Sequence, residues 1–249
     1  NNILVATPTF EKHEEVLGKL FGRLDAANMT LGAKKCFFSR PKVTYLGHTV
    51  GVDGIGPATK KVKAIMALKL PEEKKSLRTA MGILGYYRKF ILNYASVAAP
   101  LRLKMHDATL WATDKQGRSI WSHEEREAFF KLRDALMEEP ILCHPDWDQP
   151  FELHTDASHN GLGAVPSQRI DGKELVLAYA SRAVAKEEAP WCVWELEALA
   201  LVSATTHFKM YLYGKRFKLF TDYKAATHLV EYHHTQPTDH VLPWILETQ

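Results

Sequence analysis

The sequence predicts a protein of the α/β (α+β) class with two lobes. Residues 151–156 alternate apolar and polar side chains, which is the period of a half-buried strand, and Gly161 and Gly163 follow where a tight hairpin would need them. A second apolar run at residues 217–220 indicates another strand, and a helical stretch lies between the two. Residues 74–91 carry apolar side chains at helical spacing.

The composition is that of a globular protein with an uneven charge distribution. The 249 residues are 46% hydrophobic and 24% charged, enough for one large or two small domains with their own cores. The first 104 residues carry 18 Lys and Arg against 7 Asp and Glu, whereas the remainder carries 14 against 22. This asymmetry indicates a polyanion-facing surface in the first part and metal-binding carboxylates in the second. A basic face that is merely solvated is the alternative.

The sequence also indicates a cellular compartment. No apolar run approaches the roughly 18 residues that cross a bilayer, and the N-terminus has neither a basic flank nor an initiator Met. The cysteines Cys36, Cys143 and Cys192 have no paired spacing, which argues against a disulfide framework or a zinc site. We expect an intracellular protein, in the cytoplasm or the nucleus, without a signal peptide or membrane segment and cut from a longer chain.

Short elements are expected in the first part of the chain. Residues 3–6 have the pattern of a strand, and Thr7-Pro8 starts a helix with proline near its first turn. Residues 29–31 and 36–38 also have the pattern of short strands. Residues 45–54 predict a hairpin with a Gly-rich turn.

Helices are expected in the middle of the chain. One follows Pro57 and ends before Pro71, and residues 74–91 form a longer amphipathic helix. Residues 105–121 are polar and Gly-interrupted, which predicts a linker. Residues 122–125 form a capping box that begins the next helix.

A carboxylate stands at the end of each of the two expected strands of the second lobe. Asp156 and Asp222 each follow a Thr at the end of an apolar run, and the helical stretch between them carries Glu195 and Glu197. Two strand-end carboxylates with one helix carboxylate is the arrangement from which a two-metal phosphodiester site is built. A surface carboxylate is the alternative for each.

The order of the motifs resembles the Pol polyprotein of Ty3/gypsy-type LTR retrotransposons over essentially the whole chain. Each match alone is weak, but their common order makes the resemblance specific. The matching segments are residues 1–5 (palm), 31–37 (strand-and-lysine motif), 45–48 (primer grip), 77–91 (thumb), 121–146 (tether), and 155–158, 178–182, 195–200 and 221–222 (ribonuclease H domain).

The resemblance implies four regions. They are a distal palm and primer-grip hairpin at residues 1–57, a helical thumb at 58–105, a tether or connection at 106–150, and a ribonuclease H-like domain at 151–249. We expect the last to be C-terminally incomplete, because the family's fourth carboxylate would lie beyond Gln249.

The palm motif departs from the family at its metal ligands. Asn1 and Asn2 stand where the family has two aspartates that hold Mg²⁺. An amide oxygen is neutral, whereas Mg²⁺ is held mainly by carboxylates, so the resemblance implies a polymerase site that has lost its metal. Natural decay and deliberate inactivation both explain the two asparagines.

The ribonuclease H motifs are better kept. The resemblance assigns Asp156 to the aspartate that bridges two metal ions, Glu197 rather than Glu195 to the helix glutamate, and Asp222 to the fourth-strand aspartate. These residues would hold two Mg²⁺ (or Mn²⁺) ions and hydrolyse the RNA strand of an RNA–DNA hybrid. Pro166 departs from the pattern because proline cannot donate to a strand ladder.

Basic and aromatic side chains of the first part are candidates for contact with nucleic acid. The thumb resemblance favours phosphate binding over a solvated face. The candidates are Lys35, Lys60, Lys61, Lys63, Arg78, Tyr87, Arg88 and Lys89.

Two hypotheses of function follow, and they differ on whether the chain is an enzyme. The first is a retroelement reverse transcriptase–ribonuclease H fragment that binds RNA–DNA hybrid and keeps three of four nuclease carboxylates. The second is a repurposed or decayed, non-catalytic subunit of a larger assembly with other protein chains. The three carboxylates favour the first hypothesis, whereas the altered palm motif and Pro166 favour the second.

Overall fold

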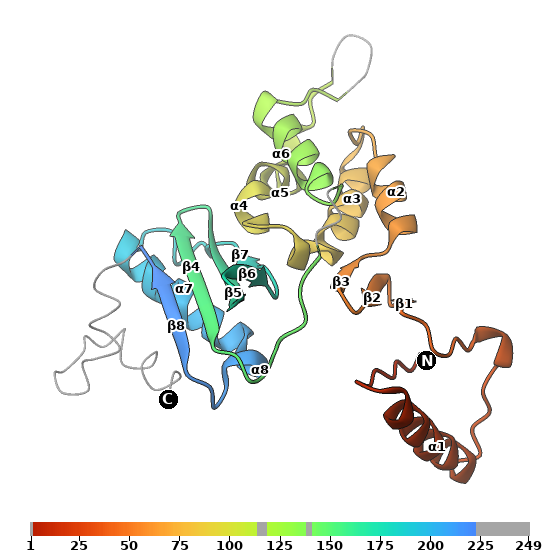
Figure 1. Ribbon diagram of the computed structural model, residues 1–249. Coiled ribbons are helices and arrows are strands. Elements are labelled where there is room, and N and C mark those ends of the chain that lie inside the picture. Colours follow the sequence, from red (N-terminus) through yellow and green to blue (C-terminus); the bar gives the residue numbers. More distant parts are fainter. Residues whose placement is uncertain (1, 114–118, 138–140, 223–249) are drawn as a thin grey trace.

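The polypeptide forms a small N-terminal region, a helical lobe and a sheet lobe, in chain order (Figure 1). Residues 2–113, 119–137 and 141–222 are described by this computed structural model. The mixture of helices and sheets confirms the predicted α/β (α+β) class.

The N-terminal region contains the predicted helix but not the predicted strands. Helix α1 (Phe10–Ala26) begins after Thr9, whose side chain accepts a hydrogen bond from the Lys12 N–H, and it has no buried residue. The strands predicted at residues 3–6, 29–31 and 36–38 are wrong, and only the 3₁₀ turn η1 (Ala33–Lys35) lies near them. Strands are stabilised by pairing and by a covered face, and these short apolar runs have neither in the described structure.

A three-stranded antiparallel sheet follows, made of β1 (Lys42–Tyr45), β2 (His48–Gly51) and β3 (Gly54–Pro57). The predicted hairpin is confirmed, and it extends into a meander with two turns. Leu46 and Gly47 have positive φ angles of 45° and 77°, as a two-residue hairpin turn requires. A Cβ at Gly54 would clash with the Leu142 carbonyl oxygen, so glycine lets the sheet dock on the chain that follows the helical lobe.

The helical lobe comprises α2 (Thr59–Met66), α3 (Lys74–Tyr86), η2 (Arg88–Phe90), α4 (Tyr94–Val97), α5 (Ala99–His106), η3 (Ala108–Leu110) and α6 (His123–Asp134). Leu77, Leu84, Leu101 and Phe129 are fully buried in one core. The helix predicted over residues 74–91 ends earlier, at Tyr86, because the backbone of the next residue leaves the helical region and tightens into η2.

Residues 105–121, predicted as a linker, are tied to the helical lobe by two tryptophans. Trp121 is buried and donates its Nε1–H to the Pro71 carbonyl at 3.1 Å. Trp111 donates to the Lys104 carbonyl at 2.8 Å. The two rings pack edge to face, so both tryptophans belong to the helical core.

Lys104 is the most deeply buried charge of the helical lobe, with 1% of its surface exposed. Its Nζ donates to the Leu110 and Ile120 carbonyls and to the Glu125 carboxylate, at 2.8, 2.9 and 2.9 Å. Glu125 also accepts from the Ser122 N–H, which confirms the predicted capping box at the start of α6.

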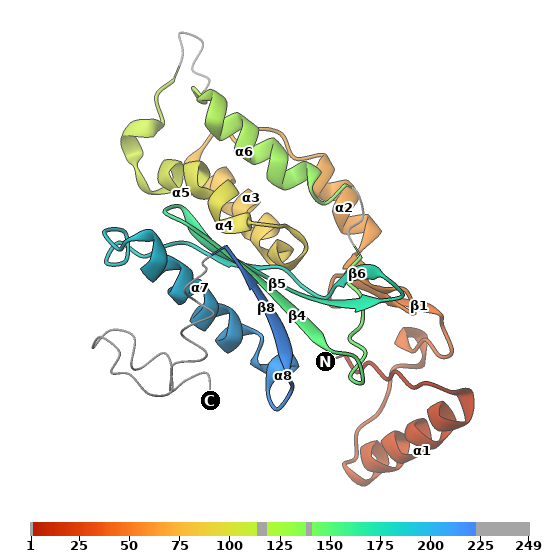
Figure 2. The same cartoon turned by 60° about the vertical axis from the view of Figure 1, so that its left-hand side comes forward.

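The sheet lobe contains β4 (Phe151–Ser158), β5 (Gly161–Ile170), β6 (Lys173–Val176), β7 (Ala180–Arg182) and β8 (Phe217–Thr221). The strand order is β6-β5-β4-β8, with β7 paired to β5 and with β4 parallel to β8. Helix α7 (Val193–His207) lies along one face of this sheet (Figure 2), and α8 (Lys209–Leu212) follows it. No helix in the described ranges is long and apolar enough to cross a membrane.

Pro166 is accommodated inside β5 by a break in the neighbouring strands. Residues 162–164 of β5 pair with β7, and residues 167–170 pair with β6, so Pro166 lies at the gap between the two. Its carbonyl accepts from the Leu177 N–H at 2.9 Å across this interrupted side. The proline therefore costs the sheet little pairing.

The glycines expected in the β4–β5 turn serve another purpose. The turn is formed by residues 159 and 160, and Gly161 and Gly163 already belong to β5. A Cβ at Gly163 would clash with the side chain of Asn93, and one at Gly161 would lie 2.9 Å from Ser96 Oγ. Both glycines therefore permit close approach of the helical lobe.

Candidate functional site

The topology of the sheet lobe places Asp156 and Asp222 at the same end of neighbouring strands. Thr155 of β4 and Thr221 of β8 are register partners in a parallel pair, and each aspartate follows directly. Both aspartates are exposed. The Thr-Asp repeat of the sequence therefore becomes a pair of adjacent carboxylates.

Helix α7 supplies the third carboxylate. Glu197 is 7% exposed, and its Oε2 is buried without a hydrogen-bond partner among the described residues. Burial, and then repulsion by Asp156 and Asp222, raise the pKa of Glu197, although hydrogen bonds from the Ala157 N–H and the Thr221 hydroxyl lower it in part. Glu197 thus faces both aspartates at once.

Glu195 has a different role from Glu197. Its carboxylate accepts from the Cys192 N–H at 2.9 Å and closes a capping box at the start of α7. The capping carboxylate explains why two glutamates lie so close together in the sequence.

The three carboxylates converge without forming a closed ligand set. Within the described ranges, no group of three His, Cys, Asp or Glu side chains is arranged to hold a metal ion. Repulsion from both aspartates contributes to the raised pKa of Glu197, so the three carboxylates lie near one another. The site therefore has the donor chemistry for a cation but an open spacing.

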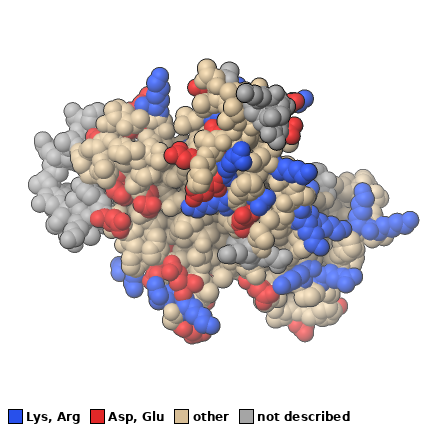
Figure 3. Space-filling model, turned by 90° about the horizontal axis from the view of Figure 1, so that it is seen from above, with Lys and Arg blue, Asp and Glu red and all other residues tan. Residues whose placement is uncertain are grey.

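Most of the predicted basic contacts are exposed. Lys60, Lys61 and Lys63 of α2 and Arg78 of α3 are exposed, and none forms an ion pair within the part of the chain described here. Figure 3 shows Lys and Arg gathered toward the side of the helical lobe and the N-terminal region. Two further predicted cations, Lys35 of η1 and Arg88 of η2, are exposed as well.

Tyr87 is a correction to the predicted contacts. Its ring is 3% exposed, and its hydroxyl donates to the Gly47 carbonyl at 2.9 Å, so Tyr87 is a core residue that anchors the first hairpin turn. Burial lowers the pKa of Lys89, whose half-buried Nζ lies 5.1 Å from the centre of the Phe90 ring. Asn2 is exposed, and Asn1 lies outside the described residues.

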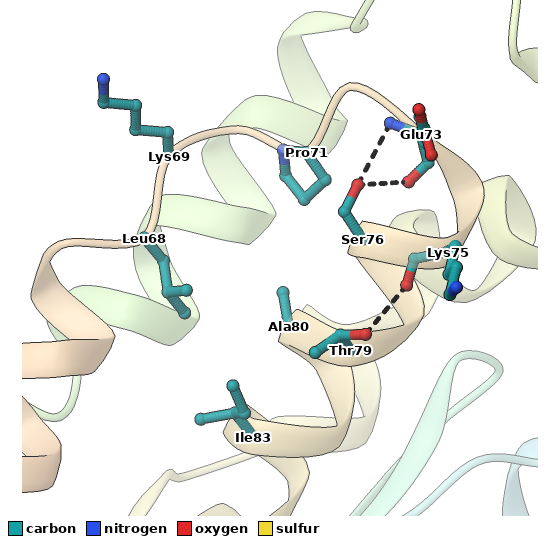
Figure 4. A pocket seen from close by; sticks show the side chains of 9 residues that line it. All are labelled: Leu68, Lys69, Pro71, Glu73, Lys75, Ser76, Thr79, Ala80 and Ile83. Atoms are coloured by element: carbon teal, nitrogen blue, oxygen red, sulfur yellow. Dashed lines mark hydrogen bonds between the residues drawn. The ribbon is translucent and has the colours of Figure 1, made fainter.

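The exposed side of α3 carries features that sequence reasoning missed. A hollow of about 400 Å³ lies between the α2–α3 connection and α3. Lys69 lines it from the connection and points outward, and Lys75 and Thr79 line it from α3 (Figure 4). Gly82 lies on the same helix, and a Cβ there would meet nothing within 4 Å. A glycine in an exposed helix interior was the available sequence signal.

Comparison with known proteins shows which sequences and folds this chain resembles. Residues 121–219 match the model of an RNase H-like domain found in reverse transcriptase. Over 224 residues, the chain is 37% identical to the retrovirus-related Pol polyprotein of transposon 297 from Drosophila melanogaster, covering 90% of the chain and 20% of that protein. The chain is a homologue of retrotransposon Pol polyproteins.

Further relatives of this Pol homologue come from insects and yeast. It is 32% identical to the Pol polyprotein of transposon gypsy from Drosophila melanogaster, over 92% of the chain and 22% of that protein. It is 27% identical to the transposon Tf2-7 polyprotein of Schizosaccharomyces pombe, over 90% of the chain and 16% of that protein. The Pol homologue thus spans about a fifth of the length of its curated relatives.

Solved structures support the fold. The foamy viral protease-reverse transcriptase in complex with RNA/DNA hybrid superimposes with a TM-score of 0.75 at 20% identity, covering 98% of the Pol homologue and 33% of that chain. The same viral protein in complex with dsDNA gives a TM-score of 0.72 at 20% identity, over 97% of the Pol homologue and 50% of that chain.

Proposed function

We propose that this chain binds RNA–DNA hybrid and hydrolyses its RNA strand at Asp156, Glu197 and Asp222, with two Mg²⁺ (or Mn²⁺) ions as cofactors. The observation that carries the proposal is the Glu197 carboxylate, which faces two aspartates and has a buried oxygen without a described hydrogen-bond partner. Such an oxygen is costly to bury unless a cation or donor satisfies it.

The donor set fits a hard divalent cation. Carboxylate oxygens are the ligands that Mg²⁺ and Mn²⁺ prefer. Glu197 is fixed by α7, whereas Asp156 and Asp222 are exposed at the open end of the sheet, where a phosphodiester could approach. Two bound ions would supply an activated water and stabilisation of the leaving 3′ oxygen. Because the present spacing is open, the side chains would have to close around the ions.

Binding of a polyanion is supported by lysines at two helix N-termini. The first turns of α2 and α3 contain Lys60, Lys61, Lys74 and Lys75 and no acidic residue. The N-terminus of a helix is already positive, and an anion near it contributes about 0.3–1 kcal/mol, whereas lysine works against the helix dipole. Phosphates of a bound duplex would offset this repulsion.

Gly82 also indicates a close partner on α3. Glycine in a helix interior costs about 1 kcal/mol relative to alanine, and no described neighbour of Gly82 requires its small size. Arg78 and Tyr86 lie one turn on either side and are exposed. We infer that this face of α3 approaches the sugar-phosphate surface of the hybrid.

The similar proteins also support binding of nucleic acid. They are Pol polyproteins, and one similar structure is a complex with RNA/DNA hybrid. We do not propose polymerisation, because Asn1 and Asn2 supply amides where a metal site would need carboxylates.

The nuclease proposal is tested by cleavage of a labelled RNA–DNA hybrid in Mg²⁺ and in Mn²⁺. We expect the wild-type chain to cut the RNA strand and Asp156→Asn to be inactive. Asp171→Asn makes the same chemical change in the exposed β5–β6 turn, where the left-handed backbone (φ 51°) tolerates Asn, and it should retain activity. Equal cleavage by wild type and Asp156→Asn would overturn the proposal.

Hybrid binding is tested by the dependence of affinity on salt. If lysines of α2 and α3 contact phosphates, affinity falls steeply between about 50 and 200 mM salt. A flat dependence over this range would show that these helices do not carry the binding.

The open spacing of the carboxylates favours a second candidate, a non-catalytic subunit of a larger assembly with other protein chains. A groove of about 960 Å³ in the N-terminal region supports it, because exposed apolar side chains such as Leu4, Phe10, Phe21 and Phe37 line it. This candidate predicts no cleavage in either metal. It also predicts that wild type and Asp156→Asn have the same melting temperature in the presence of Mn²⁺.

A further inference from the structure

The helical lobe docks on the sheet lobe through residues 88–97. The Tyr179 N–H donates to the Lys89 carbonyl at 3.0 Å, and the Ala95 N–H donates to Ser181 Oγ at 2.9 Å. Helix α4 contacts both β5 and β7, and it lies beside the sheet in Figures 1 and 2. The docking surface therefore includes β5, the strand that pairs with β4 opposite Asp156.

Asn93 is the residue of this segment that reaches the candidate site. Its backbone is left-handed, with φ 51° and ψ 34°, a conformation that asparagine tolerates better than most residues. Its Nδ2 lies 3.5 Å from Asp156 Oδ2, at the long end of the hydrogen-bond range. Asn93 thus brings an amide donor from the helical lobe to the first carboxylate of the site.

Gly163 leaves the room that this approach needs. It is the register partner of Asp156 across the β4–β5 pair, and a Cβ at this position would clash with Asn93 Oδ1. The amide of Asn93 is thus held between the backbone of Gly163 and the carboxylate of Asp156. The Asn93 side chain of the helical lobe and the Gly163 backbone of the sheet lobe therefore both lie next to Asp156.

We propose that Asn93 is a positioning residue, which orients the Asp156 carboxylate for metal binding and couples the site to the docked helical lobe. A neutral amide donor suits this role, because it restrains a carboxylate without adding a positive charge that would compete with a divalent cation. The inference rests on the proposed function of Asp156.

Asn93→Gly tests the side chain alone, because glycine keeps the left-handed backbone. We expect the affinity for Mn²⁺, measured by isothermal titration calorimetry, to fall about 10-fold, as when other partners that orient a metal ligand are removed. The kcat of hybrid cleavage should fall with it, and KM should stay within about twofold because the phosphate-binding lysines are unchanged. Ser96→Ala, in the same segment, should leave both quantities unchanged.

Gly163→Ala provides a second route to the same atom. The added methyl group would displace the Asn93 amide without removing it, and we expect a similar loss of Mn²⁺ affinity. In the Asn93→Gly background, Gly163→Ala should have no further effect, since the two changes act on one interaction. An equal loss in both backgrounds would assign the effect to backbone packing and overturn the inference.

The outcomes separate this inference from the proposed function. If Asp156→Asn binds Mn²⁺ as wild type does, the proposed metal site is wrong, and the role of Asn93 fails with it. If Mn²⁺ binding needs Asp156 but Asn93→Gly keeps wild-type affinity, only the inference about Asn93 is overturned.

Discussion

The two lobes differ in how far a buried charge is satisfied by hydrogen bonds and ion pairs. In the helical lobe, the Lys104 ammonium donates three hydrogen bonds and lies 5.2 and 4.9 Å from the ring centres of Trp111 and Trp121. In the sheet lobe, Glu197 faces two like charges and keeps one oxygen without a described partner. A satisfied buried charge belongs to the fold, whereas an unsatisfied one destabilises it and indicates a place where a ligand is expected.

The surfaces repeat this contrast. The helical lobe exposes lysines at helix N-termini, and the sheet lobe exposes the two aspartates that flank Glu197. A polyanion would therefore be held by one lobe and a divalent cation by the other.

The largest effect on stability is expected from removing the buried Lys104 cation. Lys104→Met should lower the free energy of unfolding by about 3–5 kcal/mol, because Glu125 is left buried without its cation. Denaturant unfolding measures this value. Lys131→Met on the exposed side of α6 is the control, with an expected change below about 0.5 kcal/mol. Adding Glu125→Gln to Lys104→Met should recover part of the loss, and a further loss would contradict the account.

The buried Glu197 carboxylate should make the free energy of unfolding depend on pH. Because the pKa of Glu197 is raised from its ordinary 4.5 in the folded state, its stabilising contribution is complete below the unfolded pKa and is lost as the pH rises through the folded pKa. Urea unfolding of wild type and Glu197→Gln across about pH 4 to 8 should give a difference that grows with pH, to about 1–3 kcal/mol in favour of the variant. A difference independent of pH would show that Glu197 does not titrate as the structure indicates.

A smaller effect is expected from the lysines of α2. Lys60→Gln with Lys61→Gln should weaken hybrid binding and reduce the salt slope by roughly 0.9 for each phosphate that is no longer neutralised. Lys186→Gln, an exposed lysine of the sheet lobe, is the matched control. Identical salt slopes for the α2 variant and the control would remove these lysines from the interface.

The smallest effect is expected at Gly82, and it has opposite signs in two assays. Gly82→Ala should raise the free energy of unfolding by about 0.5–1 kcal/mol, because alanine favours the helix and has open space. The same variant should bind hybrid more weakly if α3 approaches the duplex closely. A more stable variant with unchanged affinity would place the hybrid elsewhere.

Periodicity and capping signals predicted much of the fold. The alternation at residues 151–156 and the apolar run at 217–220 became β4 and β8, and the Ser122–Glu125 capping box began α6. These signals are local, so a single sequence contains them. The adjacency of Asp156 and Asp222 follows from strands that end in the same motif, but their parallel pairing is a tertiary fact.

The errors arose where distant partners decide the outcome. Residues 36–38 are apolar enough for a strand but have no strand beside them in the described structure. Gly163 had the pattern of a turn glycine, yet it makes room for Asn93, 70 positions earlier in the chain. Tyr87 and its exposed neighbour Tyr86 are equivalent by composition, and only the end of α3 sends one ring into the core.

We propose that Glu197 Oε2 lacks a described hydrogen-bond partner because Glu197 belongs to a metal site. Thermal unfolding of wild type and Glu197→Gln, each with EDTA and with Mn²⁺, tests it most directly. We expect the variant to melt at a higher temperature in EDTA, and Mn²⁺ to stabilise the wild type much more than the variant, since a bound ligand stabilises only a state with an intact site. A variant that melts lower in EDTA and gains as much from Mn²⁺ as the wild type would contradict the claim.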